Sequence, residues 1–230
     1  MTHSENMGIL TPEQWGGRSG KQCVDLAMNV ELLLTILHLS RSNASMMDAD
    51  ASAFFDCIAP ALLYLAYSKA GTSRNTTNLL GKALLRSRYY PTTSHGVLDT
   101  YNSHSKLSPF CGSGEGSCDG TPSWVQTCNP CLLTYKDNAK GMKIEDPTGK
   151  LTADGTIGAF VDDIKLFHHS PSNSNMKLLQ NTEWDSQQWS NSLWGSGGAL
   201  NFLKPIPFQS LGNSTNTATH FYLRTTPSPQ

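Results

Sequence analysis

The stretch that decides the fold is Gly158–Phe167, which reads GAFVDDIKLF. Apolar residues flank an acidic pair, Asp162 and Asp163, on both sides. This pattern predicts a strand, a tight turn and a second strand, with the two carboxylates at the turn. An Asp pair in a turn is most often only a solvated turn, so the pair indicates chemistry only if another acidic segment joins it.

A second acidic segment lies upstream at Met46–Phe55, which reads MMDADASAFF and predicts a strand leading into a turn around Asp50. Nucleotide transfer uses two divalent ions about 3.5–4 Å apart. Because Mg²⁺ prefers hard oxygen ligands, two or three carboxylates must converge on it. We therefore expect Asp50, Asp162 and Asp163 to lie on neighbouring strands.

The remaining pattern mixes helices with scattered strands and indicates an α+β fold. A helix over residues 22–40 is crowded with apolar side chains and has few charges, so we expect it to be well buried. Further helices are predicted over residues 58–68, 75–88, 121–135 and 175–194. Extended segments are predicted over 89–98 and 200–208, with a hairpin of 142–145 and 150–153 around an Asp-Pro-Thr-Gly turn.

Composition limits the cellular setting. The formal net charge is −1, which argues mildly against a complete nucleic-acid-binding protein, although a fragment that lacks its basic parts could be neutral. No apolar stretch is long enough to cross a membrane. The first residues lack the basic and apolar regions of a secretion signal. We therefore expect a cytoplasmic or nuclear protein, not a secreted one, with reduced cysteines.

Five short segments of the chain, taken in order, resemble the ordered motifs of reverse transcriptases, most closely those of the non-LTR retrotransposon type. They are PEQWGGRSG (Pro12–Gly20), DASAFFD (Asp50–Asp56), GSGEGSCDGTP (Gly112–Pro122), FVDD (Phe160–Asp163) and GGALNFLK (Gly197–Lys204). Each segment is weak alone, whereas five in the same order with similar spacing form a specific signal. The resemblance covers most of the chain.

The resemblance implies a polymerase palm-type fold, an antiparallel sheet packed against helices, with a partial fingers region. It implies a remnant of the fingers and palm entry over residues 1–45 and a palm over 46–208. Residues 209–230, which are rich in Asn, Thr, Ser and Pro, are then expected to be a disordered or frayed tail.

The resemblance also implies an RNA-directed DNA polymerase with two Mg²⁺ ions, for which Mn²⁺ would substitute. Asp50 and Asp162 would bind the two metals, and Asp163 would complete the acidic site. Lys204 would lie near the triphosphate and could act as a general acid for pyrophosphate. The expected partners are an RNA template, a DNA primer, deoxynucleoside triphosphates and the remaining parts of the same retroelement protein.

The residues that would contact nucleotide or template come from three segments. The ring of Phe55 would pack under the sugar, where it would clash with a 2′-hydroxyl and select deoxynucleotides. Glycines of the loop Gly112–Gly116 would let the backbone approach the template base and the nucleotide. The full set is Arg18, Phe55, Gly112, Gly114, Glu115 and Gly116.

The chain departs from the family pattern in two respects. Glu115 stands where the family has Gln, which places a negative charge near the template and phosphates. The basic fingers strands expected before Pro12 and a thumb expected after Lys204 are absent, so we expect a fragment with little activity of its own. A catalytically inactive palm remnant and a non-catalytic nucleic-acid-binding module therefore stay open as alternatives. An RNA-templated RNA polymerase fits less well, because such enzymes usually have a polar group near the Phe55 position.

Three other clusters have plainer interpretations beside functional ones. Four cysteines (Cys111, Cys118, Cys128, Cys131) include one Cys-x-x-Cys, but a structural zinc site normally pairs two, so buried small residues are favoured. His168-His169 is interpreted as one part of a hairpin strand. The Arg86–Tyr90 stretch is either a solvated helix end or a contact for nucleic acid.

Overall fold

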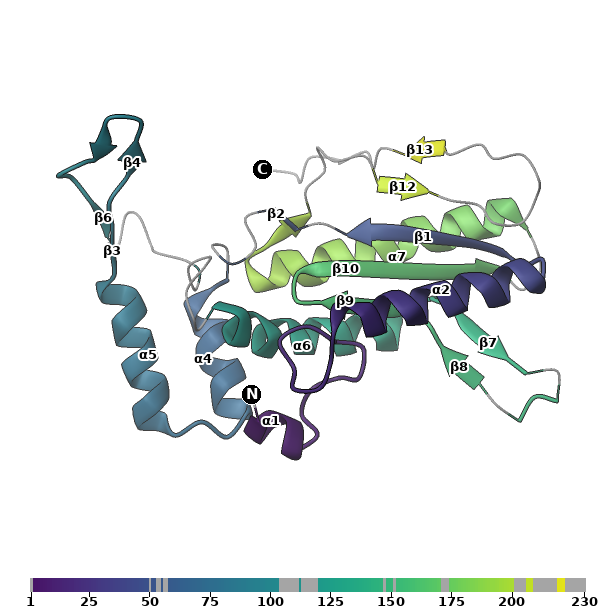
Figure 1. Ribbon diagram of the computed structural model, residues 1–230, viewed down its shortest axis with the longest axis horizontal. Coiled ribbons are helices and arrows are strands. Elements are labelled where there is room, and N and C mark those ends of the chain that lie inside the picture. Colours follow the sequence, from purple (N-terminus) through teal and green to yellow (C-terminus); the bar gives the residue numbers. More distant parts are fainter. Residues whose placement is uncertain are drawn as a thin grey trace.

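A three-stranded antiparallel sheet in the order β1-β10-β9 organises the chain, as the computed structural model in Figure 1 shows. The structure describes residues 2–49, 51–52, 55, 58–103, 112, 120–146, 148–150, 152–170, 174–200, 206–208 and 219–221. The strands are β1 (Asn43–Ala49), β9 (Ile157–Phe160) and β10 (Asp163–Ser170). The predicted hairpin is therefore confirmed, and so is the expectation that the two acidic segments belong to neighbouring strands.

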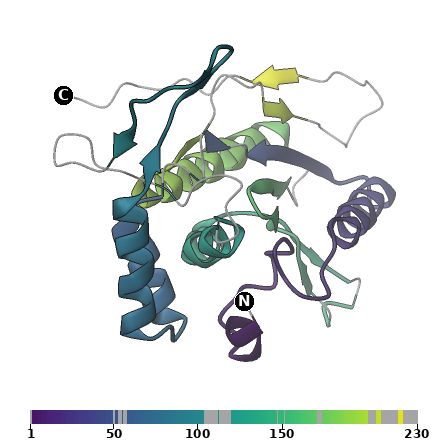
Figure 2. The same cartoon turned by 60° about the vertical axis from the view of Figure 1, so that its left-hand side comes forward.

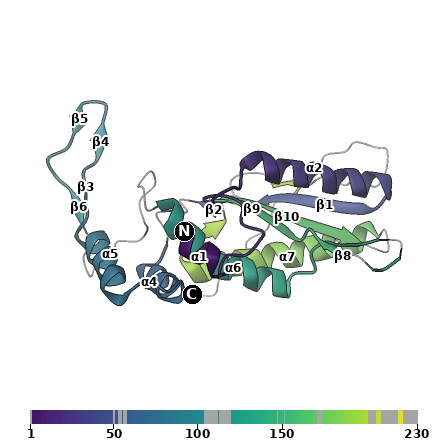
Figure 3. The same ribbon diagram turned by 60° about the horizontal axis from the view of Figure 1, so that its bottom comes forward.

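Helices cover the two faces of this sheet unequally. One helix, α2 (Cys23–Leu39), lies on one face, while α6 (Gly120–Asn138) and α7 (Asn175–Ser196) pack together on the other (Figure 3). Successive side chains of a strand point to opposite faces. Accordingly, Leu166 joins the larger core beneath α6 and α7, and Phe167 joins a smaller core beneath α2.

The expectation that the first long helix is well buried was wrong. Only Leu26 and Leu37 of α2 are buried. Apolar side chains on its outer side are exposed, with Met28 at 69% and Leu39 at 76%. The apolar residues surround the helix, but α2 is the outermost layer on its side of the sheet, so only one face of it can be buried.

The other predicted helices form close to their expected positions. Pro60 occupies the first turn of α4 (Pro60–Lys69), where a missing N–H costs nothing. The next helix is α5 (Arg74–Arg86), and α1 (Thr2–Asn6) begins the chain. Ser174 caps the start of α7, where its side chain accepts a hydrogen bond from the Lys177 backbone, and Gly197, whose φ is +96°, caps its end.

Short strand pairs surround these layers. The turned view in Figure 2 shows α4 and α5 side by side. Among the described residues, the pairs are β2 (Ala51–Ser52) with β11 (Ala199–Leu200), β3 (Arg88–Tyr89) with β6 (Asn102–Ser103), β4 (Thr92–Thr93) with β5 (Gly96–Val97), β7 (Lys143–Glu145) with β8 (Thr152–Asp154), and β12 (Ile206–Phe208) with β13 (Thr219–Phe221).

The chain is thus a mixed α and β protein with small antiparallel sheets, which confirms the predicted α+β class. Within the described ranges, no helix combines the length and hydrophobicity that crossing a membrane requires. Strand β13 lies in the segment expected to be a frayed tail and pairs with β12, with Thr219 opposite Phe208.

A buried carboxylate connects α7 to the sheet. The side chain of Asp185 is fully buried and accepts hydrogen bonds from the backbone nitrogens of Lys140 and Gly141, each at 2.8 Å. Nδ1 of the buried His168 on β10 lies 3.0 Å from the same carboxylate. Burial, and then the charge of Asp185, raise the pKa of the neighbouring Tyr135. Asp185 therefore joins α7, β10 and the segment that follows α6 at one point.

We expect Asp185→Ala to destabilise the fold by about 3 kcal/mol or more, because two backbone N–H groups and a buried imidazole lose their acceptor. Urea unfolding measures this loss. Glu183→Ala is the matched control, since Glu183 is exposed two residues away on the same helix and should change stability by about 0.5 kcal/mol at most. Equal effects of the two substitutions would contradict the anchoring role.

Candidate functional site

The turn between β9 and β10 presents the acidic pair. Val161 and Asp162 form the turn, and Asp163, which is exposed, begins β10. In the register of the sheet, Ala49 at the end of β1 lies opposite Ile164. The end of β1 therefore lies beside the acidic turn. Asp50, the next residue along the chain, lies outside the described residues.

The backbone of this turn is strained and held in place by two buried side chains. Val161 has a φ of +58°, a region that β-branched residues rarely adopt. The amide of Gln14 donates to the Val161 carbonyl at 3.2 Å and accepts from the Val161 nitrogen at 3.0 Å. The indole of Trp124 donates to the same carbonyl at 2.8 Å. These three bonds fix the residue that immediately precedes Asp162.

The segment around Gln14 reaches the turn by running along the free edge of β9. The Trp15 nitrogen donates to the Ala159 carbonyl at 2.7 Å, and the Ala159 nitrogen donates to the Glu13 carbonyl at 2.9 Å. At Gly16 the chain touches the turn so closely that a Cβ would overlap the Val161 backbone and lie 2.8 Å from the Phe160 carbonyl carbon. Glycine is therefore required at position 16.

Arg18, predicted to contact nucleotide or template, is used within the protein. Its guanidinium forms a two-pronged pair with Glu5, both contacts at 2.6 Å. It also donates to the carbonyls of Thr11 and Gln14 at 2.7 and 3.0 Å. The hydrogen bond from Arg18 holds the pKa of Glu5 below its usual range. These contacts stabilise the segment that holds the acidic turn, and the predicted contact with nucleic acid stays a prediction.

Phe55 is connected to the acidic turn through Trp124. The two rings meet edge to face, with centroids 6.4 Å apart and planes at 71°. Phe55 is partly buried against the larger core, to which Val161 also packs. Trp124 therefore contacts both the phenyl ring of Phe55 and the backbone of the turn.

Two further predicted segments lie close to the segment that follows Asp50. Strand β11 pairs with β2, with Leu200 opposite Ala51. The nitrogen of Gly112, which has a φ of +93°, donates to the Ile58 carbonyl at 2.8 Å. Ala199–Leu200 and Gly112 therefore lie near the described residues that follow Asp50 in the chain. Like Asp50, the predicted site residues Gly114, Glu115, Gly116 and Lys204 lie outside the described residues.

The sheet face that carries Asp163 is open at this end. Asp163 and Lys165 occupy alternate positions of β10 and so share a face, and Asp48 of β1 lies opposite Lys165 and forms an ion pair with it. The side chains of Asp48 and Lys165 are 44% and 34% exposed. This part of the face therefore carries the exposed Asp163 beside a carboxylate, Asp48, that Lys165 neutralises.

The described residues contain no group of three or more His, Cys, Asp or Glu side chains placed to hold a metal ion. Asp50 is not among the residues searched. The zinc alternative loses support from Cys128 and Cys131, because both lie in α6 and burial raises the pKa of both thiols. Cys111 and Cys118 lie outside the described residues. His168 points into the core toward Asp185 and not to a site on the surface.

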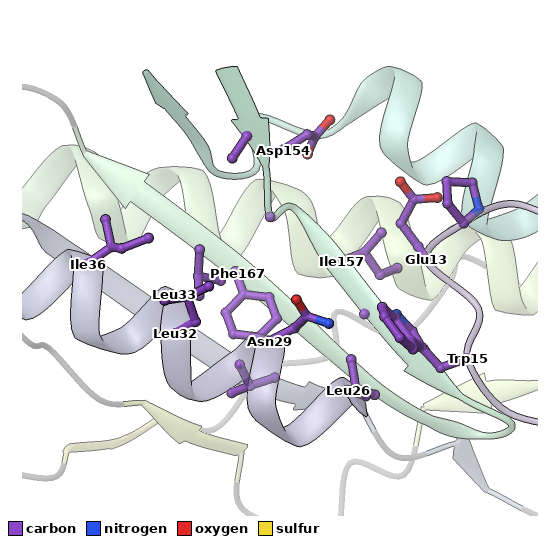
Figure 4. A pocket seen from close by; sticks show the side chains of 15 residues that line it. Glu13, Trp15, Leu26, Asn29, Leu32, Leu33, Ile36, Asp154, Ile157 and Phe167 are labelled. Atoms are coloured by element: carbon purple, nitrogen blue, oxygen red, sulfur yellow. The ribbon is translucent and has the colours of Figure 1, made fainter. Parts of the chain in front are cut away.

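An apolar groove of about 300 Å³ runs between α2 and the sheet, apart from the acidic turn (Figure 4). Leu26, Leu33 and Ile157 are among the side chains that line it. The two carboxylates at its edge, Glu13 and Asp154, both pair with Lys136. The groove thus offers packing surface without free acidic groups, and the polar chemistry is concentrated at the turn.

Sequence reasoning missed the residues that position the acidic pair. Gln14 lies within the Pro12–Gly20 segment and Trp124 lies two residues after the Gly112–Pro122 segment, but the sequence pattern predicts no role for either. The Gln-aromatic-Gly segment was the only signal, and it carried no indication that its glutamine binds a turn 147 residues away.

No family model matches the chain. No curated protein matches it either.

We expect Gly16→Ala to destabilise the protein by about 3 kcal/mol, because the added methyl group meets backbone that cannot move aside. Urea unfolding provides the measurement. Gly195→Ala is the matched control, since a Cβ there meets nothing within 4 Å, and helix propensity should make it neutral or stabilising by about 0.5–1 kcal/mol. A neutral Gly16→Ala would mean that this segment does not hold the turn.

Proposed function

We propose that the chain is the palm of an RNA-directed DNA polymerase of the reverse transcriptase type. The observation that carries the proposal is the hairpin β9–β10, whose turn presents Asp162 and Asp163 beside the end of β1, immediately before Asp50. Antiparallel strands backed by two helices, with carboxylates at one end, are what the resemblance of the sequence implies for this fold.

Divalent metal ions would be held by these carboxylates. Oxygen donors from Asp side chains are the ligands that Mg²⁺ prefers, and an exposed Asp163 beside Asp162 supplies them. Asp50, the residue that follows β1 in the chain, completes the proposed set. Two such ions would activate the attacking 3′-oxygen and stabilise the departing pyrophosphate. Mn²⁺, which accepts the same ligands, would substitute.

The chain's own residues would supply position and selectivity. Gln14 and Trp124 hold the Val161 backbone, so the neighbouring carboxylate cannot drift as charge builds up on the substrate. Phe55, packed edge to face on Trp124, would stand against the sugar and exclude a 2′-hydroxyl. Lys204 would protonate the leaving pyrophosphate.

A palm remnant without catalytic activity is the competing proposal, and Glu115 favours it. A carboxylate where the family has an amide would repel template or triphosphate. At about 4 Å and an effective dielectric of about 20, like charges repel by about 4 kcal/mol, an upper value that solvent reduces. That penalty corresponds to a loss of affinity of several hundredfold or so. We therefore expect little primer extension by the unmodified chain.

The metal site is tested by Mn²⁺ binding, followed by electron paramagnetic resonance of the free ion. Asp162→Asn with Asp163→Asn should weaken binding at least tenfold or so, because even an outer-shell partner of a metal site contributes about 10–100-fold. Asp137→Asn with Glu183→Gln, two exposed carboxylates on α6 and α7, should leave binding unchanged. Unaltered Mn²⁺ binding by the hairpin variant would refute the proposed site.

Activity is tested by primer extension on an RNA template, with the chain as it stands and with Glu115→Gln. The substitution should raise extension, and Asp162→Asn added to it should abolish the gain. Primer extension by the unmodified chain as strong as that by Glu115→Gln would refute the proposal of an inactive palm remnant. The absence of extension by both proteins would favour the inactive palm remnant.

We expect Phe55→Ala in the Glu115→Gln background to incorporate ribonucleotides more readily, because the ring that clashes with the 2′-hydroxyl is gone. The ratio of deoxynucleotide to ribonucleotide incorporation measures the effect. Phe55→Tyr keeps the ring and should keep the preference. A ratio that does not change in Phe55→Ala would show that the ring only packs against Trp124.

A further inference from the structure

Residues 74–103 form a projecting arm, made of α5 and the two strand pairs β3–β6 and β4–β5. The arm extends away from the sheet and its helices (Figure 1, Figure 3). Its base rests on α4. Only Thr77 of α5 is buried, and every residue from 88 to 103 is exposed. Because the arm is so exposed, it adds little to the core, and its side chains are available to a partner.

The charge of the arm differs from that of the rest of the chain. It has four cationic side chains, Arg74, Lys82, Arg86 and Arg88, and a single acidic one, Asp99, whereas the whole chain has a net charge of −1. All four cations are exposed. Within the described ranges, the ion pairs involve other residues. The arm is therefore a basic surface on a nearly neutral protein.

Aromatic rings lie among these cations. Tyr90 and Tyr101 have ring centroids 5.5 Å apart, and the guanidinium of Arg88 lies 4.6 Å above the Tyr101 ring. The pairing of Arg88 with Ser103 in β3–β6 brings these side chains together across the hairpin. Both tyrosines are nearly half exposed, at 46% and 43%. Exposed rings beside guanidinium groups form a surface on which bases can stack.

We propose that this arm binds single-stranded nucleic acid, with the arginines on the phosphates and Tyr90 and Tyr101 under the bases. Phosphate binding alone would serve a duplex or an anionic membrane equally well. The paired rings favour a single strand, because its bases are free to stack on a protein surface. That the strand is a polymerase template rests on the proposed function. The binding itself requires neither Asp162 nor Asp163.

Fluorescence anisotropy of labelled oligouridylate and oligothymidylate with the full chain tests the proposal. Arg86→Ala with Arg88→Ala should weaken binding about tenfold and flatten the plot of log affinity against log salt by about 1.4, since each single-strand phosphate contact contributes about 0.7. Tyr90→Ala with Tyr101→Ala should weaken binding about tenfold while leaving the salt slope unchanged. Thermal unfolding by circular dichroism checks that each variant is folded.

The matched control is Lys143→Ala with Lys150→Ala, which removes two exposed cations from the β7–β8 hairpin. It should bind oligonucleotide like the unmodified chain. Equal binding by the arm variants and the unmodified chain would overturn the proposal. Arginine-dependent binding to phosphatidylserine vesicles in place of oligonucleotide would overturn it too, and so would tighter binding of a duplex.

A double substitution in the turn between β9 and β10 separates this proposal from the polymerase proposal. Asp162→Asn with Asp163→Asn should keep oligonucleotide binding while it loses Mn²⁺. If the arm substitutions abolish oligonucleotide binding and the aspartate substitutions leave Mn²⁺ binding unchanged, only the polymerase proposal fails. If the arm substitutions leave oligonucleotide binding unchanged and the aspartate substitutions abolish Mn²⁺ binding, only the proposal for the arm fails.

Discussion

Both ends of the Gln14 side-chain amide bind the peptide nitrogen and carbonyl of Val161, and the Trp124 indole binds the same carbonyl. A positive φ at a β-branched residue costs about 1–3 kcal/mol, and such a conformation persists only where its surroundings enforce it. Here one enforcing group, Gln14, comes from the segment that runs along the edge of β9, and the other, Trp124, comes from α6. The acidic turn is therefore a rigid feature, whose backbone cannot relax without leaving buried polar groups unpaired.

The unequal covering of the sheet decides which chemistry the turn can do. Beneath β10, α6 and α7 form a closed core in which Asp185 and His168 are paired and fully buried. On the opposite face, α2 covers one part of the strands and leaves Asp163, Lys165 and Asp48 accessible. Because strand side chains alternate between faces, the same strand anchors the core and displays charge to solvent.

Exposed charges of opposite sign lie in different parts of the molecule. Carboxylates gather at the hairpin turn, whereas exposed cations gather on the arm of residues 74–103. Screening by salt limits interactions between exposed charges to about 8 Å at physiological ionic strength. Under the two proposals, the arm would hold a nucleic acid strand by its phosphates, and metal ions at the turn would meet a different part of that strand.

The sequence by itself determined the local elements. Apolar residues on both sides of Asp162-Asp163 predicted the β9–β10 hairpin, and apolar segments between turn signals predicted α2, α4, α5, α6 and α7 within a few residues. Only the tertiary structure decided that α2 is exposed on its outer side, that Arg18 binds Glu5, and that Gln14 holds the turn. Periodicity reports the conformation of neighbours along the chain, whereas these contacts join residues up to 147 positions apart. A long-range hydrogen bond leaves no period in the sequence, because each partner needs only the right side chain at one position.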